Sequence, residues 1–209
     1  MLKLYYADVS ALAPEADELP LSSYRRGKLE KQRSPLLRKQ GIGAELLLQT
    51  ALRETVPELP QPPEIAADAL GKPCLRGAEL YFNLSHSGAY AACAIADLPV
   101  GVDIQTSREY SEKLAERCFT PEERAALRAA REPDAEFTAL WTLKESYLKW
   151  KGSGIRTPMS SVSLDLSAVP VRAADAVFWH MRLQDCHLSL CVQADADPVP
   201  QAIKEVTLL

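Results

Sequence analysis

The stretch Trp141-Thr142-Leu143-Lys144-Glu145-Ser146-Tyr147-Leu148-Lys149 decides how this 209-residue chain is interpreted. At 3.6 residues per turn, a helix places Trp141, Glu145 and Lys149 above one another on one face. That face offers a carboxylate to a metal ion and an ammonium to a phosphate. The alternative is an ordinary i,i+4 pair between Glu145 and Lys149 on a solvated helix, worth about 0.2 to 0.5 kcal/mol. For this stretch taken alone, the ordinary pair is the favoured interpretation.

A second carboxylate lies in an apolar segment upstream of that helix. In residues 100–105, the two-residue period of a β-strand turns the valines and the isoleucine towards the core, and Asp103 and Gln105 towards the opposite side. An ionised carboxylate is costly to bury without a partner, so packing explains Asp103 poorly. A metal ion is the natural partner for this side chain.

Two further segments carry side chains that suit phosphate groups. Ser22–Arg33 is the most basic stretch of an acidic chain, which indicates a phosphate-bearing ligand, although a solvated helix face is the commoner meaning of such a run. Ser85 and His86 lie between two strand-like runs, so we expect a polar turn that presents both side chains to an anion. The equally favoured alternative is a hairpin turn whose side chains only satisfy backbone groups.

Composition limits the class of protein. A net charge of −4 argues against general nucleic-acid binding, which requires a basic surface. Met1–Leu12 does not resemble a signal peptide, and the longest apolar run, Ala89–Ala96, is too short to span a membrane. The five cysteines form no C-x-x-C pair, which favours free thiols in a reducing cytoplasm, and zinc at Cys186, His187 and Cys191 is disfavoured. We expect a cytoplasmic protein.

Hydrophobic periodicity and capping signals predict a mixture of helices and strands. The predicted helices are Gly41–Thr55, Ser107–Cys118, Pro121–Arg131 and Ala135–Trp150; the predicted strands are Leu2–Ala7, 100–105, Val162–Leu166, Ala176–Leu183 and His187–Gln193; Val56–Glu64 is a loop. Thr120, Pro121 and Glu123 form a capping-box pattern, so Glu123 is interpreted as structural. Gly152-Ser153-Gly154 is a C-cap signal at the end of the last predicted helix. Both halves run from helix to strand pair, and the second half is interpreted as a diverged copy of the first.

Four short motifs, taken together, resemble a known family. Gly71-Lys72-Pro73, Asn83-Leu84-Ser85-His86-Ser87, Val100–Ile104 and Trp141–Lys149 are similar in order and spacing to the 4′-phosphopantetheinyl transferases of the surfactin-synthetase-activator (Sfp) type. With the basic cluster, the likeness extends from about Ser22 to Ile155. It implies an α+β fold of two similar lobes in a pseudo-twofold arrangement, each an antiparallel sheet packed with helices. It also implies a monomer.

The resemblance implies a reaction and two sides of a site. The phosphopantetheine arm of coenzyme A would pass to a serine of an apo acyl or peptidyl carrier protein, with Mg²⁺ present, and adenosine 3′,5′-bisphosphate would be released. Residues 1–99 would form the N-terminal lobe on the side of the nucleotide, and residues 100–209 the C-terminal lobe that holds the metal and the catalytic helix. Asp103 and Glu145 would bind Mg²⁺, and Lys149 would contact the pyrophosphate. Glu145 is the candidate general base, directly or through a water.

The remaining residues that the resemblance assigns to coenzyme A all lie in the first half of the chain. They are Ser85 and His86 at phosphate groups, Lys72 and Pro73 beside the adenine nucleotide, and Arg25 and Lys28, from an ungapped match, at the 3′-phosphate.

One position departs from the pattern of the family. Sfp-type enzymes often have a second acid two residues after the strand aspartate, whereas this chain has Gln105, so a third metal ligand would be neutral or replaced by water. Magnesium commonly needs only one or two carboxylates when phosphates and waters complete its coordination, so we expect activity with weaker metal affinity. Two other functions stay open. Gln105 motivates a catalytically weak binding module for coenzyme A or carrier protein, and a magnesium-dependent phosphohydrolase is disfavoured because only Glu145 could activate water.

Overall fold

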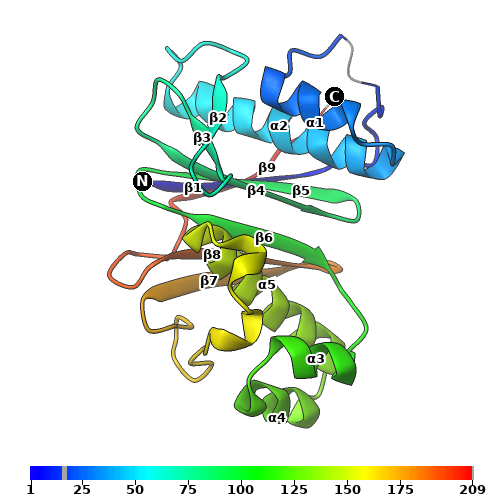
Figure 1. Ribbon diagram of the computed structural model, residues 1–209, viewed down its shortest axis with the longest axis vertical. Coiled ribbons are helices and arrows are strands. Elements are labelled where there is room, and N and C mark those ends of the chain that lie inside the picture. The colour runs from blue at the N-terminus through cyan, green and yellow to red at the C-terminus, as the bar shows by residue number, and fades with distance from the viewer. Residues whose placement is uncertain (16–17, 209) are drawn as a thin grey trace. The chain divides into compact units, whose positions relative to one another are not determined.

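The computed structural model describes residues 1–15 and 18–208, and the chain forms two compact units (Figure 1). The first unit is Met1–Val100 with Pro200–Leu209, and the second is Gly101–Val199. The predicted division gave all of 100–209 to the second lobe. The structure instead returns the C-terminal segment to the first unit, because β9 (Ala202–Glu205) pairs in parallel with β1 (Leu2–Asp8).

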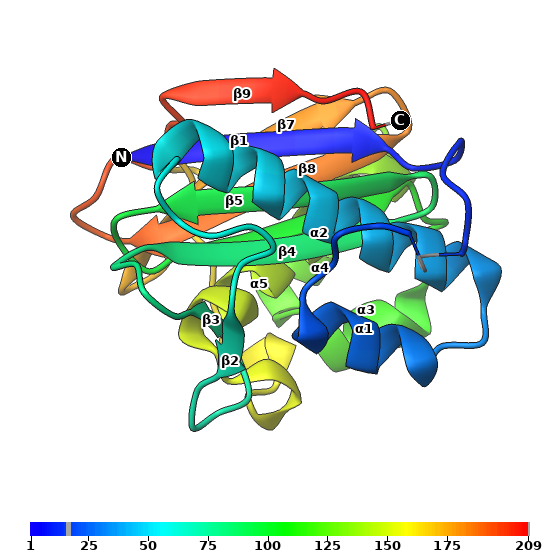
Figure 2. The ribbon, with the colours of Figure 1, turned by 90° about the horizontal axis from the view of Figure 1, so that it is seen from above.

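The first unit is built on a four-stranded sheet with the order β4-β5-β1-β9. β4 (Tyr81–Ser87), β5 (Tyr90–Ala96) and β1 are antiparallel neighbours, and only the β1–β9 pair is parallel. The long helix α2 (Pro35–Thr55) lies across this sheet, as Figure 2 shows. Its buried leucines pack with Tyr5 and Ile95 in one core.

Helix α2 begins six residues before the predicted start at Gly41. Ser34 caps the helix by accepting a hydrogen bond from the backbone N–H of Leu37, and Pro35 occupies the first turn, where its missing N–H costs nothing. The basic stretch forms the short helix α1 (Ser23–Glu30), which begins at the N-cap Ser22. Both helix starts follow from local capping chemistry.

Two short strands of the first unit were not predicted. β2 (Ile65–Ala67) and β3 (Pro73–Leu75) pair with each other in an antiparallel two-stranded sheet. The predicted loop Val56–Glu64 contains no helix or strand.

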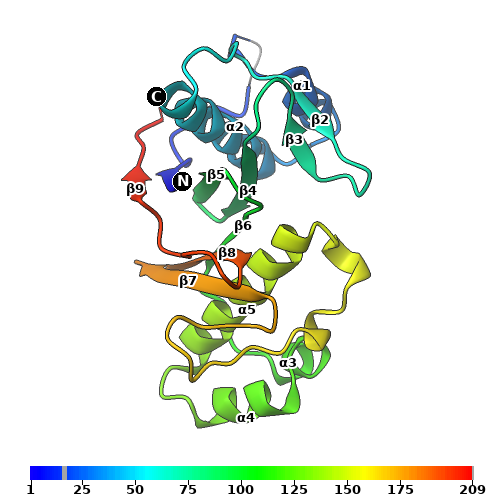
Figure 3. The ribbon, with the colours of Figure 1, turned by 90° about the vertical axis from the view of Figure 1, so that its left-hand side faces the viewer.

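The second unit has a three-stranded antiparallel sheet with the order β6-β8-β7, on which α5 packs (Figure 3). The elements are β6 (Gly101–Thr106), β7 (Ala176–Leu183), β8 (Cys186–Gln193) and α5 (Pro133–Lys151). A Cβ at Gly101 would lie only 2.0 Å from the carbonyl oxygen of Ser146, so only glycine permits this approach of helix to strand. As predicted, α5 ends at Gly152, which has a left-handed backbone with φ of 68°.

The remaining helices of the second unit confirm part of the prediction. α4 (Pro121–Ala129) begins with the predicted capping box between Thr120 and Glu123. The helix predicted from Ser107 is wrong at its start, because α3 (Glu112–Cys118) begins after the N-cap Ser111. The strand predicted at Val162–Leu166 is also wrong. That region has two 3-10 turns, η1 (Gly154–Arg156) and η2 (Met159–Ser161), and a single β-bridge between Asp165 and Arg172.

The predicted α+β class is confirmed, and each unit combines a sheet with a long helix on one of its faces. The expectation of purely antiparallel sheets is wrong for the β1–β9 pair alone. None of the helices within residues 1–15 and 18–208 is long and apolar enough to cross a membrane.

Candidate active site

In the second unit, the strand aspartate meets the face of α5 that was predicted to be functional. Lys149 Nζ donates to Asp103 Oδ1 over 2.6 Å, and Asp103 is only 6% exposed. Glu145 lies one helical turn before Lys149 and is half-buried. Burial and the negative charge of Asp103 raise the pKa of Glu145, while Lys149 acts in the opposite direction. The structure therefore brings together the three residues predicted for this part of the site.

Local backbone geometry explains why these side chains meet. Gly101 lets α5 approach β6 closely, and Asp103 lies on the same face of β6 two residues further on. On the neighbouring strand β8, Ser189 pairs with Asp103 and its hydroxyl lies 2.8 Å from that of Thr142 on α5. The close approach at Gly101 on β6 and the hydroxyl contact on β8 thus hold α5 against this sheet.

The donor set of this cluster fits a magnesium ion. Asp103 lies close enough to Glu145 that its negative charge raises the pKa of Glu145. A divalent cation would relieve the repulsion between the two carboxylates. The described residues contain no group of three or more His, Cys, Asp or Glu side chains placed to hold a metal. Two carboxylates are nevertheless a common protein contribution to Mg²⁺, with substrate phosphates and waters supplying the other ligands.

Gln105 follows Asp103 on β6 and is half-buried. Its Nε2 lies 3.4 Å from the carbonyl oxygen of Thr106 and donates to it. In the β6–β8 register, Gln105 faces His187, as Asp103 faces Ser189. Whether Gln105 contributes to metal binding stays a prediction.

The other basic residue of the quoted stretch has a different role. Lys144 is completely buried, and its Nζ lies 2.5 Å from Glu123 Oε2 and 3.2 Å from the carbonyl oxygen of Met159. Glu123 also accepts from the backbone N–H of Thr120 and from that of Leu164. Burial lowers the pKa of Lys144, and the contact with Glu123 counteracts this effect. Lys144 therefore joins α5 to the start of α4, and Glu123 is structural as predicted.

In the first unit, one pocket of about 230 Å³ collects four of the six residues from the first half of the chain that were predicted to contact coenzyme A. They are Arg25 and Lys28 from α1, Pro73 from β3 and His86 from β4. Tyr24, Phe82 and Asn83, for which no role was predicted, also line this pocket. Tyr24 lies inside the basic stretch, and Asn83 lies inside the motif of β4. Their position beside residues with predicted roles was the sequence signal that could have identified them as pocket residues.

Arg25 supplies a largely buried cation in the wall of this pocket. Its Nε lies 3.9 Å from Oε2 of the fully buried Glu45, and burial lowers the pKa of Arg25. Neither Arg25 Nε nor Glu45 Oε2 has a hydrogen-bond partner within the described part of the chain. Gly41 makes room for the guanidinium, since a Cβ there would lie 3.1 Å from an Arg25 nitrogen. Because Glu45 compensates the charge of Arg25, the exposed Lys28 gives the pocket its positive character.

The remaining two predicted residues do not line this pocket. Ser85 is 5% exposed, and Lys72 Nζ donates to the carbonyl oxygen of Val100 over 3.2 Å. The expected polar turn at Ser85 and His86 is wrong, because both residues lie within β4 and pair with Ala92 and Ala91. Successive side chains of a strand point to opposite faces, which separates Ser85 from His86.

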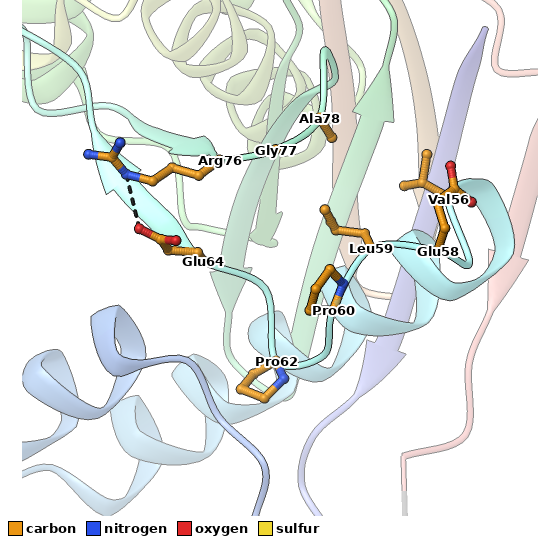
Figure 4. Close-up of a pocket in the computed structure, with 9 residues that line it drawn as sticks. All are labelled: Val56, Glu58, Leu59, Pro60, Pro62, Glu64, Arg76, Gly77 and Ala78. Atoms are coloured by element: carbon orange, nitrogen blue, oxygen red, sulfur yellow. Dashed lines mark ion pairs between the residues drawn. The ribbon is translucent and has the colours of Figure 1, made fainter.

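A second pocket of the first unit, of about 380 Å³, lies beside the proline-rich loop (Figure 4). Leu59, Pro60 and Pro62 line it, and Arg76 and Glu64 at its wall form an ion pair of 3.1 Å. This pocket includes none of the residues predicted to bind coenzyme A or metal.

Comparison with known proteins identifies a family. Residues 99–203 match the 4′-phosphopantetheinyl transferase superfamily. This chain is 30% identical over 173 residues to a 4′-phosphopantetheinyl transferase of Bacillus subtilis, which covers 79% of this chain and 77% of the relative. It is 37% identical over 100 residues to 4′-phosphopantetheinyl transferase Sfp of Bacillus subtilis strain 168, covering 46% and 44% of the two chains. The solved structure of Thermotoga maritima holo-[acyl-carrier-protein] synthase has a TM-score of 0.41 and 20% identity, over 46% of this chain and 62% of that one.

Proposed function

The chain belongs to the 4′-phosphopantetheinyl transferase superfamily, and from this premise we propose that it transfers the phosphopantetheine arm of coenzyme A to a serine of an apo acyl or peptidyl carrier protein. The observation that carries the proposal is the cluster on β6 and α5, in which Lys149 Nζ lies 2.6 Å from Asp103 Oδ1 and Glu145 has a raised pKa. The cluster supplies two carboxylates, Asp103 and Glu145, for a metal and a base, and the ammonium of Lys149 for a phosphate.

Asp103 and Glu145 would hold a magnesium ion. When bound, the metal neutralises charge on the pyrophosphate, which otherwise repels an incoming oxygen nucleophile. The neutral Gln105 would add at most a weak ligand, directly or through water. Lys149 can keep its bond to Asp103 and still donate to a phosphate oxygen, since an ammonium has three N–H donors.

Glu145 is the proposed general base. In the metal-free protein burial and Asp103 raise its pKa, and a bound Mg²⁺ would counteract that rise, so its part as a base rests on its position beside the metal, directly or through a water. It would take the proton of the carrier serine while the serine oxygen bonds to the phosphorus that bears pantetheine. The bond from that phosphorus to the bridging oxygen breaks, and adenosine 3′,5′-bisphosphate leaves with the electron pair.

The pocket on α1, β3 and β4 is proposed to take the nucleotide end of coenzyme A. Lys28 and Arg25 suit a phosphate, and Pro73 and His86 line the same space. This gives the first unit the nucleotide and the second unit the metal and the base. Lys72 and Ser85 stay predictions from the resemblance, as do the cytoplasmic location and the monomeric state.

A single assay tests the function. The protein is mixed with Mg²⁺, coenzyme A and an apo carrier protein, and the carrier is weighed by mass spectrometry. We expect a phosphopantetheine adduct that is lost in Glu145→Gln. An unmodified carrier together with measurable coenzyme A binding would instead support the binding module that Gln105 motivates. Release of inorganic phosphate would support a hydrolase.

A further inference from the structure

Two histidines of the second unit form a pair that includes none of Asp103, Glu145 and Lys149. His180 on β7 and His187 on β8 place Nε2 and Nδ1 3.0 Å apart, and their rings stack with centroids separated by 5.2 Å. Burial lowers the pKa of His180 to about 4 and also lowers the pKa of His187. Both rings are therefore uncharged at neutral pH.

The second ring nitrogen of His187 is unsatisfied. His187 is 3% exposed, and its Nε2 is buried without a hydrogen-bond partner among the described residues. Buried polar groups in native proteins nearly always have a partner, from the protein, from ordered water or from a bound molecule. His187 therefore has one position for a hydrogen bond that the protein itself leaves unfilled.

Both histidines line a pocket of about 550 Å³, a size within the usual range for small-molecule sites. Most of its wall is apolar and comes from α4, α5 and the segment before β7, with Leu127, Ala139, Leu140, Leu143, Leu166 and Val171 among the lining residues. Asp103, Glu145 and Lys149 do not line it. At about 100° per residue, Glu136 of this pocket lies about 180° around α5 from Glu145.

The charges of the wall select against an anionic ligand. Lys144 compensates Glu123 at 2.5 Å, and Arg182 compensates Glu132 at 2.9 Å. Glu136 adds a further negative charge, and the two imidazoles add none. A cationic group would have to leave water for a largely apolar space, which is costly.

We propose that this pocket binds a small uncharged organic molecule, with an aliphatic chain against the leucines and an amide or hydroxyl group at the histidine pair, where a small movement of the His187 ring brings its buried Nε2 within hydrogen-bond reach. An imidazole nitrogen is a donor or an acceptor according to its tautomer, and amides and hydroxyls can meet either case. A transition metal between the two rings would need further ligands, and the described residues offer no third His, Cys, Asp or Glu placed for one. Binding in this pocket does not require the proposed transfer reaction, although His187 pairs in the sheet with Gln105.

NMR of the histidine rings tests the proposal with an internal reference. The chain has three histidines, and the third, His86, lies in the first unit. The intact protein is titrated with hexanamide, hexanoate and hexylamine. Hexanamide should shift the imidazole resonances of His180 and His187 saturably and leave His86 unchanged. The two charged probes should bind at least about tenfold more weakly, because burying their charge is costly.

Matched variants locate the binding site. Ala139→Leu fills the pocket and should weaken hexanamide binding at least about tenfold. Ala129→Leu, on an exposed part of α4 that does not line the pocket, should leave the affinity for hexanamide unchanged. His187→Phe keeps an aromatic ring but removes the nitrogen, and should weaken binding about three- to tenfold, read from His180. Leu166→Trp narrows the exposed rim and gives a second test if Ala139→Leu does not fold.

Three results would overturn the proposal. The first is the absence of a saturable shift of His180 and His187 at the solubility limit of hexanamide. The second is equal binding by the wild type and by the folded pocket-filling variant. The third is tighter binding of hexanoate or hexylamine than of hexanamide, which would show that the ligand class is wrong.

Discussion

Lys149 Nζ lies 2.6 Å from Asp103 Oδ1, so an ion pair joins the last turns of α5 to β6. Glu145 experiences both charges, since Asp103 raises its pKa and Lys149 lowers it. We therefore expect opposite effects from two substitutions in metal-free protein. Asp103→Asn should lower the pKa of Glu145, and Lys149→Ala should raise it. A ¹³C NMR titration of the glutamate carboxyl groups, after metal chelation, measures both, and shifts of the same sign would contradict this geometry.

Glu145→Gln should abolish transfer and make the metal-free protein more stable at neutral pH. As a general base, Glu145 contributes roughly 10² to 10⁴ in rate. Because its pKa is raised in the folded state, ionisation of Glu145 destabilises the fold as pH rises. Scanning calorimetry should show a Tm above that of wild type that appears as the pH rises above about 4, where an ordinary glutamate ionises. Wild-type transfer rates in this variant would remove Glu145 from the mechanism.

Gly101→Ala should harm both the fold and the activity. Its Cβ would lie 2.0 Å from Ser146 O and 2.5 Å from Trp150 N, so α5 must move from β6. We expect a loss of about 1 to 3 kcal/mol in the free energy of unfolding, measured with urea, and slower transfer. Gly27→Ala is the control, because nothing lies within 4 Å of its added Cβ and alanine stabilises a helix by about 1 kcal/mol.

Lys28→Ala should raise the KM for coenzyme A more than the KM for 3′-dephospho-coenzyme A. The exposed Lys28 lines the pocket in which Glu45 already compensates Arg25, so its ammonium is available to a phosphate. Lys31→Ala removes the same charge at the C-cap of α1, outside the pocket, and should affect both substrates little. An equal rise in KM for both substrates in Lys28→Ala would mean that Lys28 does not contact the 3′-phosphate.

Gln105→Glu should lower the Mg²⁺ concentration that gives half-maximal transfer. It would add a carboxylate two residues after Asp103 on the same face of β6. Gln193→Glu, at the exposed end of β8 in the same sheet, controls for the added charge and should change nothing. An unchanged Mg²⁺ requirement in Gln105→Glu would mean that position 105 does not face the metal.

The sequence predicted best those features that depend on neighbouring residues. Helical period alone aligned Glu145 with Lys149, and the capping box at Thr120 and the glycine end of α5 are local signals that the structure confirms. Asp103 is buried and has a partner, as the cost of burying a carboxylate implies, but the partner in the structure is Lys149, which was not foreseen, and a metal at Asp103 stays a prediction.

The errors arose where distant segments decide the structure. The parallel pairing of β9 with β1 joins residues nearly a full chain length apart, and no local pattern indicates it. Ser85 was expected in a turn, but pairing with β5 extends β4 through Ser87 and leaves the reversal to Gly88, whose φ is 54°. The pair of His180 with His187 also depends on how two strands align.

The parallel partner of β1 has a consequence for shortening the chain. β9 is the outermost strand of the sheet in the first unit. Deleting residues 202–205 would uncover the backbone donors and acceptors of β1, a bare edge that invites pairing with other molecules. Trimming the C-terminal end would therefore damage the first unit, which carries Arg25 and Lys28. It would not directly affect the second unit, although the second unit precedes this end in the sequence.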